Sequence, residues 1–229
     1  MNKLEQRRQE EREERRSAIL ATAQELFYNH GVRNVTIGQV ADSLRLSRSL
    51  IYTYFKDLNH ILCSAAFNAL SLLHESFQET LKASASGSGV EGVSALGRTY
   101  IEFAFQHPEQ YQSIQDFQGF SREGLSLNSP TESALDQQFK AELQGLNHLS
   151  HQINVLIADE LSRGIKEGSI RSDLGDPLSV ALSLWAQTSG LIQFCLLLEH
   201  SMLAQYQISR TEFLENGIRL IQQSIIKAP

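Results

Sequence analysis

Residues 36–55, TIGQVADSLRLSRSLIYTYF, contain two helix starts in quick succession. Thr36 and Gln39 form a capping box, because the threonine hydroxyl can accept from the glutamine backbone while the glutamine side chain reaches back. Ser47 is a second good N-cap further along the same stretch. The spacing leaves room for one helix of about two turns and a three-residue turn. Two short helices at this separation predict a helix-turn-helix.

The second of these helices has one apolar side and one polar side. Ile51 and Phe55 lie four residues apart and are expected to form its buried stripe. The other side has two cations, two hydroxyls, a phenol and no acid, from Arg48, Ser49, Tyr52, Thr53 and Lys56. Arginine can pair with two acceptors of one guanine, and the other side chains suit phosphates or base edges. The pattern favours a helix that reads DNA over an ordinary solvated amphipathic helix.

Residues 17–62 resemble the N-terminal signature of the TetR/AcrR-type bacterial transcriptional regulators. The matching residues are Ala23, Phe27, Gly31, Thr36, Ile37, Val40, Ala41, Leu46, Ser47, Ile51, Tyr52, Tyr54, Phe55 and Lys56. The resemblance implies an all-α fold, with an N-terminal helix-turn-helix unit of three helices and a larger helical domain for ligand binding and dimerisation. It also implies contacts with operator DNA from Thr36, Arg48, Ser49, Leu50, Tyr52, Thr53, Tyr54 and Lys56.

Three residues depart from the pattern of this family. Arg45 stands where the family usually has the glycine of the turn, so a bulky residue has to adopt a left-handed conformation at a cost of roughly 1 kcal/mol. Ser49 replaces a frequent glycine or proline, which is expected to alter the bases that are read. Leu58 stands where the family often has a lysine, so one phosphate contact is expected to be missing.

The charge is unevenly spread along the chain. Residues 1–62 hold 10 Lys and Arg against 8 Asp and Glu, a net charge of +2, whereas residues 63–229 have a net charge of −8. A mildly basic head on an acidic body fits DNA contact confined to one end. We therefore expect a DNA-binding domain at 1–62, in which 1–16 is a charged and partly helical extension, and a ligand-binding and dimerisation domain at 63–229.

Two helices with apolar faces are expected near the C-terminus. Residues 178–198 carry no charge. The stretch is long enough to span a membrane, but it contains six Ser, Thr and Gln residues. These polar residues favour a helix buried in protein. By resemblance, Pro177–His200 and Ser209–Lys227 form the homodimer interface as a four-helix bundle across a twofold axis. The charged N-terminus lacks the apolar run of a signal peptide, so a cytoplasmic protein without a membrane partner is expected.

Seven of the eleven phenylalanines fall between residues 67 and 139, where the resembling family has its inducer pocket. Because ligand pockets are mostly apolar with few polar groups, a small apolar effector is expected to bind there. The expected lining residues are Phe67, Phe77, Tyr100, Phe103, Phe117, Phe139 and His148.

Nothing in the sequence indicates an enzyme, since it lacks a glycine-rich phosphate loop, GxSxG and HExxH. His148 and His151 have a spacing that could serve a metal, but ordinary polar residues are favoured. Cys63 and Cys195 are expected to be buried, reduced thiols. The sequence thus predicts a regulator without catalytic residues, metal or cofactor, most simply a repressor that an effector releases from a palindromic operator. The alternatives are an activator of the same fold or, in another class, a helical enzyme or a membrane-associated protein.

Overall fold

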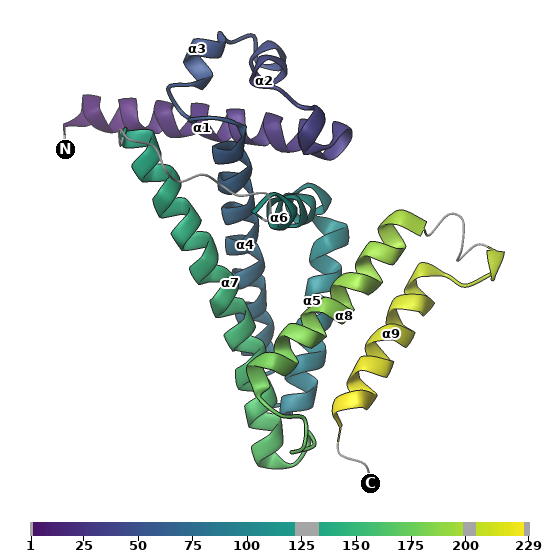
Figure 1. The fold of residues 1–229 in the computed structure, drawn as a ribbon. Coiled ribbons are helices and arrows are strands. Elements are labelled where there is room, and N and C mark those ends of the chain that lie inside the picture. Colours follow the sequence, from purple (N-terminus) through teal and green to yellow (C-terminus); the bar gives the residue numbers. More distant parts are fainter. Residues whose placement is uncertain (1, 122–132, 199–204, 227–229) are drawn as a thin grey trace. The chain divides into compact units, whose positions relative to one another are not determined.

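The computed structural model describes residues 2–121, 133–198 and 205–226 (Figure 1). In these ranges the regular elements are helices, which confirms the expected all-α fold. They are α1 (Lys3–His30), the 3₁₀ turn η1 (Val32–Asn34), α2 (Ile37–Ser43), α3 (Arg48–Ile51), α4 (Leu58–Ala83), α5 (Gly89–Gln106), α6 (Pro108–Ser121), α7 (Ala134–Glu167), α8 (Pro177–Leu198) and α9 (Arg210–Ile225).

Contacts divide the chain into two compact units. The first comprises Met1–Ser71 and His107–Leu149, and the second comprises Leu72–Gln106 and Ser150–Pro229. The helices α4 and α7 each contribute residues to both units. The expected functional boundary at residue 62 lies inside α4, so it does not coincide with a break in packing. The division into a domain at 1–62 and a domain at 63–229 stays a prediction.

The core of the first unit lies where α1 packs against α2 and α6. Ile19, Ala23 and Phe27 of α1 are buried and follow one another at helical spacing, which places them on one face. Ile51 and Phe55 are fully buried, as their spacing predicted. The helix-turn-helix is therefore anchored to α1 by its apolar residues, and its polar residues are left for the surface.

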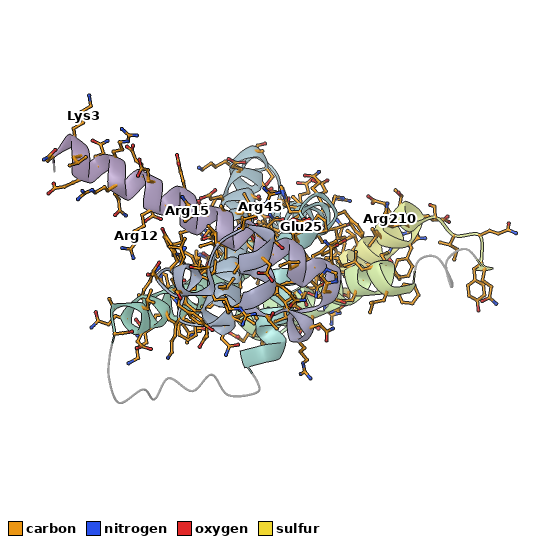
Figure 2. The ribbon with its side chains drawn as sticks, turned by 90° about the horizontal axis from the view of Figure 1, so that it is seen from above. Lys3, Arg12, Arg15, Glu25, Arg45 and Arg210 are labelled. Atoms are coloured by element: carbon orange, nitrogen blue, oxygen red, sulfur yellow. The ribbon has the colours of Figure 1, made fainter. Side chains whose placement is uncertain are left out.

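The charged extension at the N-terminus is part of α1, which begins at Lys3 and not near Ser17. Asn2 caps the helix and forms a capping box with Glu5. Pairs at i and i+4, such as the 3.0 Å contact between Arg7 and Glu11, support the exposed turns that follow. Figure 2 shows Lys3 and Arg12 projecting from this part of α1. The expectation of a helical extension is thus confirmed.

In the second unit, α5 contacts α8 and α9. The Tyr100 hydroxyl lies 3.1 Å from Ser189 Oγ, which joins α5 to α8, while Phe194 and Phe213 stack with ring centroids 4.9 Å apart between α8 and α9. At Gly89 a Cβ atom would lie 2.3 Å from the backbone nitrogen of Gly164, so α5 and α7 cross with their backbones in contact. Glycine is required at this crossing.

By length and composition alone, residues Pro177–Leu197 of α8 could cross a membrane. The expected burial of this helix in protein is not seen within the single chain, because only 28% of its 18-residue apolar window is buried. Both cysteines are buried, as expected, and carry free thiols. Burial raises the pKa of the Cys63 thiol to about 12, so this group is protonated near neutral pH.

Candidate DNA-binding surface and ligand pocket

The first helix start of the helix-turn-helix has the predicted geometry. The backbone N–H of Thr36 donates to Gln39 Oε1 at 2.7 Å, and the backbone N–H of Gln39 donates to Thr36 Oγ1 at 3.3 Å, so the capping box is complete. The helix α2 then runs for seven residues. The second start is also as predicted, because Ser47 Oγ accepts from the backbone N–H of Leu50 at 3.2 Å.

The turn between α2 and α3 contains the predicted left-handed residue. Arg45 has φ 55°, and the chain is closed there by a 2.8 Å hydrogen bond from the Leu46 N–H to the Ala41 carbonyl. A residue with a side chain is strained in this backbone conformation, so Arg45 lowers the free energy of unfolding relative to a glycine at the same position.

The reading helix is shorter than the sequence pattern suggested, because α3 ends at Ile51. After it the chain tightens: the N–H groups of Thr53 and Tyr54 bond three residues back, to Leu50 and Ile51, each at 3.0 Å. The Thr53 hydroxyl also donates to the Leu50 carbonyl at 2.7 Å. These local bonds turn the chain toward α4 while Phe55 stays fully buried.

All eight residues with a predicted role in DNA binding have accessible surface. Thr36, Arg48, Ser49, Tyr52 and Thr53 are exposed, and Leu50, Tyr54 and Lys56 are partly exposed. The guanidinium of Arg48 lies against Gly38 of α2, where a Cβ atom would be 2.8 Å from Nη2. A shallow surface hollow is lined by Thr36, Ile37, Gly38, Arg48, Tyr52, Asp57, Leu58 and Asn59.

Lys56 has a partner that its sequence neighbourhood does not reveal. Its Nζ lies 2.6 Å from Oδ1 of Asp136, in the first turn of α7. The hydrogen bond raises the pKa of Lys56 and holds the pKa of Asp136 well below its usual range. The acid comes from 80 positions further along the chain, so the polar side of residues 48–56, which has no acid in its own sequence, ends at a carboxylate.

A largely buried polar cluster lies behind the helix-turn-helix. Glu142 of α7 accepts from Nη2 of Arg16 at 2.6 Å and from the hydroxyl of Ser64 on α4. The Nε2 atom of His60, which is fully buried, is 3.5 Å from Glu142. Burial raises the pKa of Glu142, but the nearby imidazole of His60, hydrogen bonds from Ser64 and Gln138 and the charge of Arg16 outweigh it, and the net pKa is lowered. The carboxylate thus joins α1, α4 and α7.

Aromatic rings surround this polar cluster. The Arg16 guanidinium lies 4.7 Å from the centroid of the Phe55 ring. The imidazole of His60 contacts Phe55 edge-on at 5.3 Å and Phe139 at 5.2 Å. On the outer side, the Arg12 guanidinium lies 5.9 Å from the ring of Tyr54. The N-terminal extension of α1 therefore reaches Tyr54, which follows α3.

The second unit contains an apolar pocket formed by α4, α5, α7, α8 and α9. Its lining residues are Phe77, Val93, Ser94, Leu96, Gly97, Tyr100, Ile157, Leu184, Trp185, Thr188, Ile218, Ile221, Gln222 and Ile225. The rings of Tyr100 and Trp185 stack with centroids 4.3 Å apart. The cavity between the lining residues is small, about 40 Å³. The pocket is therefore narrow.

The structure does not gather the seven expected pocket residues in this pocket. Phe77 and Tyr100 line it, and Phe103 is buried elsewhere in the second unit. The other four, Phe67, Phe117, Phe139 and His148, belong to the first unit. Their side chains have other surroundings, since Phe139 contacts His60 and His148 is exposed. Trp185, Thr188 and Gln222 were missed because the C-terminal helices were interpreted only as an interface.

Within residues 2–121, 133–198 and 205–226, no group of three or more His, Cys, Asp and Glu side chains is arranged to hold a metal ion. The segments expected to form the dimer interface correspond to α8 and α9, while Glu199, His200 and Lys227 at their ends lie outside the described residues.

Comparisons with known proteins agree with this geometry. Residues 19–62 match the profile of the family described as bacterial regulatory proteins, tetR family. No curated protein matches the chain in sequence.

Solved structures match almost the whole chain in fold. The ketosteroid transcriptional regulator KstR2 of Mycobacterium tuberculosis has 17% identity and a TM-score of 0.67, covering 93% of this chain and 96% of that one. A protein of Saccharomonospora viridis, solved in complex with choline, has 19% identity and a TM-score of 0.70, covering 94% and 100%. The TetR family regulator PfmR of Thermus thermophilus has 16% identity and a TM-score of 0.65, covering 90% and 97%. Residues 19–62 are therefore a DNA-binding helix-turn-helix of the tetR family, and the chain has the fold of that family's transcriptional regulators.

Proposed function

We propose that the chain is a cytoplasmic, homodimeric repressor that leaves a palindromic operator when a small, largely apolar molecule enters the pocket of the second unit. The accessible face of the helix-turn-helix carries this proposal, because all eight residues with a predicted DNA contact have exposed surface there. Such a repressor needs no catalytic residue, metal or cofactor.

Arg48 is the residue that we expect to read a base. It lies in the first turn of α3, the part of such a helix that reaches deepest into the major groove. Tyr52, with half of its surface exposed, follows one turn later on the same face. The hydroxyls of Thr36 and Thr53 donate to Gln39 and to Leu50, so in this arrangement they are available to DNA as acceptors.

The pocket supports an effector that is mostly apolar with a few polar groups. Most of its lining is aliphatic or aromatic, and Ser94, Tyr100, Thr188 and Gln222 supply polar atoms. Because little of its volume is open, binding requires the lining side chains to move apart. A ligand that binds the widened pocket more tightly shifts the chain toward that conformation, which is the condition for changing DNA affinity.

The fold alone does not choose the effector. The solved structures of this fold include one named for a ketosteroid and one that holds choline, and these two molecules differ in size and charge. The class of effector therefore has to be inferred from the residues that line the pocket of this chain. Their aliphatic and aromatic character points to an uncharged, largely apolar molecule.

The two C-terminal helices support a homodimer. Leu182 and Leu197 of α8 are 52% and 75% exposed, and Leu220 of α9 is 64% exposed, in the isolated chain. Between the two leucines of α8 lies Gly190, at which an added Cβ atom would meet no neighbouring atom of the described residues within 4 Å. Ser183, Ala186 and Gly190 are exposed between these leucines, and such small side chains allow a second helix to approach closely. A second copy of the chain would cover the exposed leucines, and this explains the apolar surface of α8 without a membrane.

The experiment begins with the DNA that the pure protein selects from genomic fragments. A panel of apolar compounds is then screened by melting temperature, since a ligand at a hundred times its Kd adds roughly 2.7 kcal/mol of stability. Compounds that stabilise the protein should release the selected DNA. A panel that stabilises the protein yet leaves DNA affinity unchanged argues against an inducer pocket.

Two matched variants test whether the effector binds in this pocket. Ser94 and Ser76 each donate to a carbonyl four residues back, at 2.7 and 2.9 Å, but only Ser94 lines the pocket. Ser94→Leu should fill the pocket, keep DNA binding and abolish release by the compound. Ser76→Leu should keep both. Release that survives in Ser94→Leu would place the effector elsewhere.

A further inference from the structure

We propose that Asp136 withholds Lys56 from DNA, so that this carboxylate on α7 sets the affinity of the reading surface for every DNA sequence. The inference rests on the proposed function, because it takes Lys56 to be a phosphate contact. It adds a residue outside the helix-turn-helix, one that competes with DNA for the lysine. The contact that carries it is the 2.6 Å pair between Lys56 Nζ and Asp136 Oδ1.

Asp136 is held in place from its other side. Its Oδ2 accepts from the backbone N–H of Ser133 at 3.1 Å and from the Ser133 hydroxyl at 2.7 Å. Ser133 Oγ in turn accepts from the backbone N–H of Asp136, which completes a capping box at the start of α7. The aspartate therefore has a structural reason to stay where it is, with Oδ1 directed to the lysine. Its side chain is only 10% exposed.

The lysine is fixed at its backbone, and its side chain is partly exposed. The backbone N–H of Lys56 donates to His60 Nδ1 at 3.2 Å, and the preceding Phe55 is fully buried. The side chain itself is 33% exposed. Because the backbone is anchored, the ammonium exchanges between Asp136 and a phosphate by rotation of its own side chain, without movement of the reading helix.

A second attachment, through Glu142, keeps α7 beside the helix-turn-helix and α1 when this exchange takes place. Glu142 lies six residues after Asp136 on the same helix, about 9 Å along its axis, and it is bound to Arg16 and Ser64. Asp136 thus stays near the lysine after the lysine has turned to a phosphate. An unpaired carboxylate next to DNA then opposes binding further.

The exchange has a defined effect on salt dependence. A lysine that binds a phosphate releases a condensed counterion from the DNA, with a slope of about 0.9 per contact in log affinity against log salt. When Lys56 leaves Asp136, the freed carboxylate takes up a cation and cancels part of this release. Asp136→Asn keeps an oxygen for the Ser133 cap and removes the charge, so the full slope should return.

The test measures the affinity of the full chain for a scrambled duplex and for a selected genomic fragment across a salt series. We expect Asp136→Asn to bind both DNAs about twofold to fivefold more tightly per subunit, with a slope steeper by up to about 0.9 per subunit. Lys56→Ala should weaken both DNAs and flatten the slope. In the double variant the gain from Asp136→Asn should be largely lost, because the lysine that it releases is absent.

Asp159→Asn is the matched control, since it removes the same charge from an exposed position of α7 in the second unit. It should leave affinity and slope unchanged. A readout without DNA is acylation of lysine amines followed by mass spectrometry, in which Lys56 should react faster in Asp136→Asn than in the parent chain.

Each contrary result has a separate meaning. An equal gain from Asp136→Asn with and without Lys56 would show that the aspartate acts only through general charge, and this overturns the inference. Unchanged labelling of Lys56 would also overturn it, because the pair would then not restrain the amine. If the parent chain binds neither duplex, the proposed function fails and this inference fails with it. Binding by the parent chain without any gain in Asp136→Asn overturns the inference alone.

Discussion

Arg16 of α1 and Glu142 of α7 are 126 positions apart in sequence, and their side chains meet at 2.6 Å with less than a fifth of either exposed. The pair lies beside the fully buried His60 and Phe55. Charges in such a place are stabilising only while they are paired, because an unpaired charge keeps its full desolvation cost. Glu142 is thus the buried carboxylate among the contacts that join the helix-turn-helix unit to α7.

Removing this carboxylate should weaken the fold strongly. We expect Glu142→Ala to lower the free energy of unfolding by about 3 kcal/mol, since it leaves Arg16 buried without its partner. The matched control is Glu11→Ala, which breaks the exposed pair with Arg7 and should cost less than about 1 kcal/mol. Urea unfolding measures both. Equal losses would show that the buried pair is not special.

The same carboxylate predicts a dependence of stability on acid. The pKa of Glu142 is lower in the folded chain than its ordinary value of about 4.3. Its contribution is therefore present above the ordinary pKa and is lost as the pH falls through the folded-state pKa. The parent chain should lose stability more steeply than Glu142→Gln when unfolding is followed from about pH 6 to pH 3. Parallel curves would contradict the lowered pKa.

The left-handed turn predicts a stabilising substitution. Arg45→Gly should raise the free energy of unfolding by about 0.5–1 kcal/mol, because glycine adopts a positive φ without a steric cost. The melting temperature should rise by about 2–4 °C for each 1 kcal/mol. Glu79→Gly, at an exposed position inside α4, is the control and should have the opposite sign. A fall in both variants would mean that Arg45 makes contacts worth more than its strain.

Arg48 is predicted to read a single base. Arg48→Ala should cost about 1–3 kcal/mol in binding to the selected operator and relax the preference at one position. Affinities for a set of single-base variants of the operator measure this. Lys82→Ala removes an exposed cation in the second unit and should change nothing. If Arg48→Ala weakens operator and scrambled DNA equally, Arg48 contacts phosphate and not a base.

The position of the dimer interface can be tested at two exposed glycines that both have open space beside them. A Cβ atom added at Gly190 on α8 or at Gly119 on α6 would meet no neighbouring atom within 4 Å in the part of the chain that the structure describes. Gly190→Leu should leave the single chain folded and weaken the dimer, because it blocks the close approach of the partner helix. Gly119→Leu should leave the dimer intact. Light scattering gives the mass of each variant, and an unaffected dimer in Gly190→Leu would move the interface away from this face.

The helix-turn-helix was predictable from sequence because its signals are local. Thr36, Gln39 and Ser47 cap helices within three residues of their partners, and Ile51 and Phe55 mark the buried side by their spacing. The early end of α3 was not predictable in this way. The spacing of Ile51 and Phe55 is the same whether the residues between them are α-helical or in tighter turns.

The contacts of α7 could not be predicted, since Asp136 and Glu142 lie on an ordinary amphipathic helix and their partners are far away in sequence. The residues of α8 and α9 that line the pocket were not predicted for another reason. On α9, Ile218 is buried in the chain while Leu220 is 64% exposed. Apolar periodicity alone does not distinguish residues that pack in the chain's own core from residues at an interface with a second chain.

The helical extension at the N-terminus makes the orientation of the reading unit measurable. Lys3 to Arg16 continue the same helix whose later turns pack in the core, so they form a rod about 21 Å long. A spin label or dye near Lys3 is thereby rigidly joined to the helix-turn-helix. In a dimer, the distance between two such labels would follow the two reading heads directly, and a small rotation of each head would be enlarged at the end of its rod.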